Sequence, residues 1–144
     1  MSFQWLQMRI TEEHDRRRRE SEVLERLPRA LQEVHQNLQV CVEAYRESFG
    51  EHAAELQLMR SRIQIVVREE AEGQWQQQSA VNVITVPEIP GFRIERGGES
   101  LIVEVGMLPS DRVFYRDREL DQYLNMDELT KRILDRAFFP KLRE

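Results

Sequence analysis

Residues 92–105 read FRIERGGESLIVEV, two runs of alternating apolar and polar residues on either side of Gly97-Gly98. This pattern predicts a β-hairpin, because a two-residue glycine loop joins antiparallel strands and fixes which residues lie opposite one another. The predicted pairs are Arg96 with Glu99, Ile94 with Leu101, and Phe92 with Val103. The apolar members of these pairs all fall on one face, which predicts an antiparallel sheet with one buried face.

Similar period-two runs flank this hairpin and predict three further strands, five in all. Their apolar positions are Ile63, Ile65 and Val67; Val81, Val83, Ile84 and Val86; Phe92 and Ile94; Leu101, Val103 and Val105; and Val113, Phe114 and Tyr115. Turn residues separate the runs at 72–73, 87–91, 97–98 and 108–111. We expect a five-stranded antiparallel meander over residues 56–120, in which a four-residue loop at 108–111 places Phe114 opposite Val105.

Helical spacing occurs on both sides of the strands. Between residues 28 and 50 apolar residues recur at alternating steps of three and four, which predicts an amphipathic helix over 28–50 with Pro28 in its first turn. A second helix is predicted over 126–139, with Asn125 as its N-cap. Packing helices on one apolar sheet face gives an α+β two-layer sandwich, with residues 28–144 as a single domain.

Residues 1–27 are interpreted as a separate N-terminal helical arm. Its apolar tip, and the interface we expect, consists of Phe3, Trp5, Leu6, Met8 and Ile10. The next twelve residues, Thr11–Glu22, contain no apolar side chain, and as a helix they carry the tip roughly 18 Å from the core at ~1.5 Å per residue. We expect the tip to dock on a second copy, as a homo-oligomer with a dimer favoured, or on another protein. Folding back onto its own sheet and lying on a membrane surface are the alternatives.

The composition narrows the class of protein. The chain has 144 residues, 33% of them charged, and a formal net charge of −5. Neither half has a basic excess, so nucleic acid is not an expected partner. Cys41 is the only cysteine, which excludes an internal disulfide and a cysteine-based zinc site and indicates a reducing compartment. Because no apolar run reaches the length of a membrane span, we expect a cytoplasmic protein.

Three features of the helical half resemble functional sites. Arg16–Arg19 suggests phosphate binding, but six acidic residues balance the six arginines of the arm, which favours a solvated helix with Glu–Arg pairs. Cys41 lies in the apolar stripe with no histidine at helical spacing, so we expect a structural cysteine. His14, His35 and His52 form no pair at metal-ligand spacing, so no metal is expected.

Two features of the sheet carry polar side chains. Asp117 and Glu119 would form paired carboxylates on one face if the strand continued that far, but their arginine neighbours favour a charged turn leading into the last helix. The predicted registers also bring four side chains together on the outer sheet face, as a possible ligand-binding group: Arg93, Glu95, Glu104 and Tyr115. Cross-strand ion pairs are the simpler explanation for that group.

No motif in the sequence specifies a catalytic residue or a cofactor. We expect a non-catalytic interaction protein that self-associates through its N-terminal arm. Two alternatives stay open: a small-ligand binding protein or cofactorless enzyme that uses the open sheet face, and a nucleic-acid-associated module that uses Arg16–Arg19.

Overall fold

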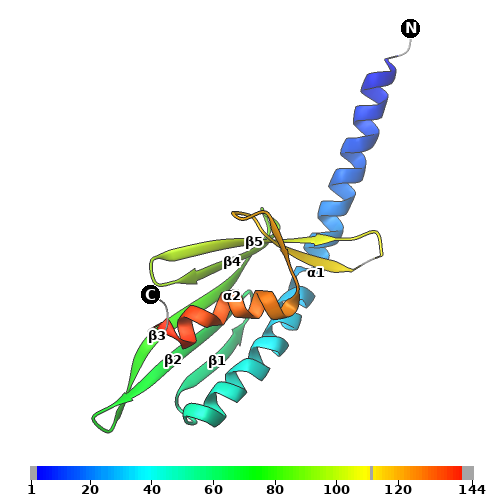
Figure 1. Ribbon diagram of the computed structural model, residues 1–144. Coiled ribbons are helices and arrows are strands. Elements are labelled where there is room, and N and C mark those ends of the chain that lie inside the picture. The colour runs from blue at the N-terminus through cyan, green and yellow to red at the C-terminus, as the bar shows by residue number, and fades with distance from the viewer. Residues whose placement is uncertain (1–2, 111, 141–144) are drawn as a thin grey trace.

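A computed structural model describes residues 3–110 and 112–140 as a long helix, an antiparallel sheet and a C-terminal helix (Figure 1). The helices are α1 (Gln4–Phe49) and α2 (Met126–Phe138). The strands are β1 (Ala54–Met59), β2 (Arg62–Ala71), β3 (Gln74–Val86), β4 (Gly91–Arg96), β5 (Glu99–Met107), β6 (Val113–Asp117) and β7 (Gln122–Leu124). The strands lie in the sheet in chain order. The predicted α+β class and antiparallel meander are therefore confirmed.

The sheet has seven strands within the described residues, so the prediction of five was wrong. The two additional strands, β1 and β7, lie at the two edges of the sheet. β1 reads AELQLM and contains no β-branched residue, although Leu56 lies opposite Ile65 in the ladder. β7 is three residues long, which is too short for period two to be recognised. Both strands form because they pair with a neighbour, β2 or β6, whose sequence has a stronger β-strand pattern.

The hairpin at Gly97-Gly98 has the predicted register. Arg96 lies opposite Glu99, Ile94 opposite Leu101 and Phe92 opposite Val103. Phe92, Ile94 and Val103 are buried and Leu101 is half-buried, all on the core face. The glycine pair and the alternating pattern were therefore sufficient to predict this part of the sheet.

The next hairpin has a different register from the predicted one. Val105 lies opposite Tyr115 rather than Phe114, because residues 108–112 form a loop one residue longer than expected. A shift of one residue moves every side chain of β6 to the other face. Tyr115 therefore faces the core, and Phe114 faces away from it. Asp111, which belongs to the predicted turn, lies outside the described residues.

Both helices pack on the same face of the sheet, so the core lies between a helical layer and a β layer (Figure 1). α2 lies mainly against β3, whereas α1 lies against β1, β2 and β5. The centre of the core is formed by Leu38, Ile63, Ile65, Val81, Val83, Phe92, Leu129 and Ile133, all fully buried. The opposite face of the sheet, which we call the open face, carries no helix of the described chain.

The first helix does not begin at Pro28, as the sequence predicted, but runs continuously through it. Proline inside a helix removes one backbone hydrogen bond and costs about 3 kcal/mol. Here the ring is exposed, and Leu27 and Leu31 on either side are buried against the sheet. Packing of these neighbours offsets the local cost, so the arm and the core share one helix.

The start of α2 agrees with the sequence. The Asn125 side chain accepts a hydrogen bond from the Glu128 amide (2.8 Å), and Glu128 accepts one from the Asn125 amide (3.2 Å). This reciprocal capping box satisfies two amides at the helix start, and Asp127 and Glu128 add negative charge at the positive end of the helix dipole. The cap fixes where α2 begins and therefore which side chains it presents to the sheet.

Candidate functional site

The N-terminal part of α1 leaves the rest of the molecule. The first buried residue of the helix is Val23, and Figure 1 shows the preceding turns extending away from the sheet. The five side chains of the predicted interface, from Phe3 to Ile10, are between 40% and 66% exposed, with Trp5 the most exposed. The structure therefore places these residues together at the tip of the arm, in contact with no core.

The middle of the arm is held by ion pairs within the helix. Glu13 pairs with Arg16 and with Arg17 (3.2 Å), and Arg18 pairs with Asp15 (3.1 Å). Hydrogen bonds from Arg16 and then Arg17 lower the pKa of Glu13 to about 2. The expected Glu–Arg pairing of this segment is confirmed for these arginines, since each uses its charge on a neighbouring carboxylate.

None of the described helices has an apolar stretch long enough to cross a membrane. In the arm, apolar side chains are confined to the tip and to the last turn before the body, where Val23, Leu24 and Leu27 lie. The tip is therefore a short apolar patch on a polar helix.

Arg93, Glu95 and Glu104 lie on the open face, as predicted, but Tyr115 does not. Tyr115 is 5% exposed on the core face and stacks against Phe92, with ring centroids 6.2 Å apart. Its placement on the outer face was wrong, because the β5–β6 loop is one residue longer than expected. The predicted group of four is thus divided between the two faces.

The three charged residues on the open face are occupied by ion pairs. Arg93 Nε lies 2.7 Å from Glu95 Oε1, an ion pair without hydrogen-bond geometry at this nitrogen. Glu104 accepts hydrogen bonds from Arg118 (2.8 Å) and Arg116 (3.1 Å), and these, the Arg118 bond first, lower its pKa below the ordinary value. The Glu104–Arg116 pair is cross-strand, as the simpler explanation of the sequence has it, whereas Arg93 and Glu95 pair within β4.

Apolar side chains also reach the open face. Val66, Ala80, Ile84 and Ile102 are half-buried there, and the Phe114 ring lies over Gly106 and contacts the Tyr123 ring, with centroids 5.4 Å apart. On β5 Ile102 shares this face with Glu104, and on β6 Phe114 shares it with Arg116. The open face is consequently a mixed surface rather than a continuous apolar one.

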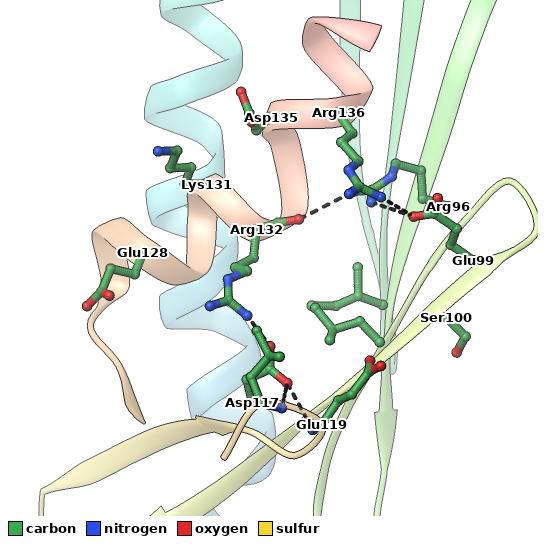
Figure 2. Close-up of a pocket in the computed structure, with 13 residues that line it drawn as sticks. Arg96, Glu99, Ser100, Asp117, Glu119, Glu128, Lys131, Arg132, Asp135 and Arg136 are labelled. Carbon is green, nitrogen blue, oxygen red and sulfur yellow. Dashed lines mark hydrogen bonds and ion pairs between the residues drawn. The ribbon is translucent and has the colours of Figure 1, made fainter. Parts of the chain in front are cut away.

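A groove that the sequence did not predict lies between α2, the β4–β5 hairpin and the β6–β7 turn. Its volume is about 610 Å³, and Ile94, Leu101 and Leu120 provide apolar lining. Figure 2 shows charged side chains along it, with Arg96, Arg132 and Arg136 directed toward acidic partners. The groove contains both signs of charge and depends on segments far apart in the sequence.

Asp117 lines this groove but is itself buried, with 1% of its surface exposed. Its Oδ1 accepts hydrogen bonds from the amides of Glu119 (3.0 Å) and Leu120 (3.2 Å), and its Oδ2 pairs with Arg132. Arg132 also donates to the Gln122 side chain (2.6 Å). The carboxylate therefore closes the β6–β7 turn and ties it to α2. The strand ends at Asp117, which confirms the predicted charged turn, although β7 separates that turn from the last helix.

The other arginines that line the groove are also paired. Glu99 accepts hydrogen bonds from Arg96 (3.0 Å) and Arg136 (2.8 Å), and these arginines, Arg96 first, lower its pKa. Arg96 also donates to the Arg132 carbonyl oxygen (3.3 Å). Each arginine that lines the groove thus has an acceptor inside the chain, an arrangement that favours stabilisation over general acid–base chemistry.

The remaining candidates from the sequence lie apart. Cys41 is half-buried against the core, as expected of a structural cysteine, and the His52 ring lies 5.9 Å from the Trp75 ring. Within residues 3–110 and 112–140, no group of three or more metal-ligating side chains is arranged to hold an ion.

No protein-family model matches the chain, and no curated protein or solved structure is significantly similar to it.

Proposed function

We propose that this chain is a non-catalytic interaction protein that self-associates through its N-terminal arm. The observation that carries the proposal is the exposed apolar tip of α1, where Trp5 is 66% and Met8 64% exposed. Tryptophan and methionine are enriched in the centres of protein interfaces. Their position at the end of a polar helix separates them from the chain's own core.

The spacing explains why a second molecule is needed. Residues 11–22 form a straight polar segment of α1, roughly 18 Å long at ~1.5 Å per residue. While this segment stays helical, the tip cannot fold back onto the sheet. Removing the tip from water gains about 25 cal/mol for each Å² of apolar surface buried, and the chain's own core cannot supply this gain.

The alternatives have less support. A ligand site on the open face loses Tyr115, which lies on the other face, and the remaining charges there are paired. A nucleic-acid role for Arg16–Arg19 competes with the acidic residues that hold Arg16, Arg17 and Arg18. With Cys41 as the only cysteine, the cytoplasm is the compartment that we propose.

Light scattering of the full chain and of a chain lacking residues 1–22 tests this proposal. Among residues 3–22, which the structure describes, the deletion removes no buried residue. The body should therefore keep its fold and the circular dichroism signal of its β-sheet. We expect the full chain to have a mass above the 17.2 kDa of a monomer and the shortened chain to be monomeric.

A matched pair of variants separates the tip from general surface effects. W5S/L6S removes two tip side chains, whereas V40S removes an apolar side chain of the same helix that is 67% exposed but lies beside the body. We expect W5S/L6S to weaken self-association and V40S to leave it unchanged. A full chain that stays monomeric at high concentration, or a shortened chain that associates equally well, contradicts the proposal.

A further inference from the structure

The exposed apolar residues of the arm continue the stripe that packs α1 on the sheet. In the body this stripe is Leu31, Val34, Leu38, Cys41 and Tyr45. The same alternation of three and four residues, followed toward the N-terminus, gives Leu27, Leu24, Glu20, Arg17, Glu13, Ile10 and Leu6. The stripe is a heptad pattern along the whole helix, apolar at both ends of the arm and charged in its middle.

This stripe loses its cover where the arm leaves the body. Leu27 is the last residue of the stripe, counted toward the N-terminus, that is buried in the core. Burial changes accordingly: Leu31 and Leu38 are buried, whereas Leu24, Ile10 and Leu6 are 41%, 41% and 40% exposed. The exposed half of the stripe can therefore be covered by another helix without collision with the sheet.

The charged positions determine which orientation of a second arm fits. In a parallel pair, Glu13 would face Glu13, Arg17 would face Arg17 and Glu20 would face Glu20, and like charges across a helix pair are unfavourable. In an antiparallel pair, Glu13 faces Arg17 of the second copy and Arg17 faces its Glu13, in addition to the Glu13–Arg17 pair within each helix. The same register places Leu6 opposite Leu24 of the second copy, so apolar layers close both ends.

We infer that two copies of the chain associate as an antiparallel pair of arms, an inference that rests on the proposed function. Glu13 of each copy faces Arg17 of the other, and Leu6 of each copy faces Leu24 of the other. Ile10 comes opposite Glu20, whose carboxylate is held by Arg16 of its own chain at 2.5 Å, so the methylene groups of Glu20 can cover Ile10. The charged central layers specify register and orientation, and the apolar end layers supply most of the affinity.

Charge reversal tests the central layers. E13R places an arginine opposite Arg17 of the second copy, and R17E places a glutamate opposite its Glu13. Each variant alone should raise the dissociation constant by about tenfold or more. A mixture of E13R chains with R17E chains restores opposite charges across the interface while leaving the like-charge repulsion inside each helix. We expect the mixture to associate as wild type does, measured by analytical ultracentrifugation.

Crosslinking tests the orientation. In a C41A background, L6C chains are mixed with L24C chains that carry a C-terminal tag, and a short bismaleimide joins thiols that lie close together. Both positions are exposed on the arm, so neither variant should disturb the body. We expect the mixed L6C–L24C product to dominate, whereas a parallel pair gives L6C–L6C and L24C–L24C products.

The outcomes separate this inference from the proposed function. If wild type is monomeric, the proposed function fails and the inference fails with it. If wild type self-associates through the tip but the E13R and R17E mixture does not recover, or the homologous crosslinks dominate, the antiparallel pairing is wrong and the proposed function stands.

Discussion

Arg132 on α2 pairs with the buried carboxylate of Asp117, fifteen residues earlier at the end of β6. The same carboxylate accepts two amide hydrogen bonds from the β6–β7 turn. One side chain thereby joins the last hairpin of the sheet to the helix that covers the core. The contact links elements whose mutual positions also define the groove.

The first prediction concerns the stability that Asp117 provides. D117A leaves two turn amides and Arg132 without their acceptor in a buried site, and we expect a loss of roughly 3 kcal/mol in the free energy of unfolding. E119A, which removes an exposed carboxylate two residues away, is the control and should change stability by less than about 0.5 kcal/mol. Urea unfolding measures both, and equal small effects would contradict the role assigned to Asp117.

The second prediction is a pH dependence at Glu104. Its pKa in the folded protein is lowered from the ordinary 4.5, chiefly by the hydrogen bond from Arg118. A lowered folded pKa contributes stability above the unfolded pKa, and this contribution is lost as pH falls through the folded value. Wild type should therefore exceed E104Q by about 1 kcal/mol at pH 7, after allowance for partial exposure.

The test of this pH dependence is urea unfolding of wild type and E104Q between pH 7 and pH 3. The difference between the two proteins should be constant above the unfolded pKa and should shrink below it. A difference that grows as pH falls would contradict the assignment.

The third prediction compares two glycines. A Cβ at Gly91 would lie 2.2 Å from the Val103 carbonyl oxygen, whereas a Cβ at Gly106 would lie 2.2 Å from Cζ of the Phe114 ring. Backbone in a sheet cannot move aside as a half-buried ring can, so G91A should cost about 3 kcal/mol and G106A about 1 kcal/mol. Thermal unfolding of the two variants shows which substitution destabilises the protein more.

A double variant tests the reason for that order. F114A removes the ring that lies over Gly106, so G106A should cost nothing further in the F114A background. The same F114A change should leave the cost of G91A unaltered. Additive effects of G106A and F114A would show that the ring is not the cause.

The fourth prediction concerns the hydroxyl of Tyr115. Among the described residues it is buried without a hydrogen-bond partner, and burial, followed by the charge of Glu33, raises its pKa. Y115F removes a polar group that nothing satisfies, so we expect unchanged stability or a gain of up to about 1 kcal/mol in denaturant unfolding. Y123F, at an exposed ring, is the matched control. A loss above about 1 kcal/mol for Y115F would reveal a partner for the hydroxyl.

Local signals predicted the parts of the fold in which neighbouring residues determine the geometry. Gly97-Gly98 fixed a two-residue loop and with it the pairing of β4 and β5, because a short loop leaves a single register. The Asn125 and Glu128 side chains fixed the start of α2 through a cap that spans three residues. The tip of the arm was identified by its separation from the next apolar residue, and the structure leaves it exposed.

Longer-range packing decided the rest of the sheet and helices. β1 and β7 carry weak local patterns and form because β2 and β6 offer them backbone partners. The loop at 108–112 is one residue longer than its composition suggested, and this single residue moved Tyr115 into the core. α1 continues through Pro28 because Leu27 and Leu31 are buried on either side of it.

The sequence by itself determined that this chain has an antiparallel sheet with one apolar face, a capped C-terminal helix and an apolar N-terminal tip beyond a polar spacer. These features follow from spacing over a few residues, which fixes the faces of helices and strands. Only the tertiary structure decided which face Tyr115 occupies and that Asp117 meets Arg132 in a groove. Such contacts depend on registers and helix positions set by the whole core, so no local pattern encodes them.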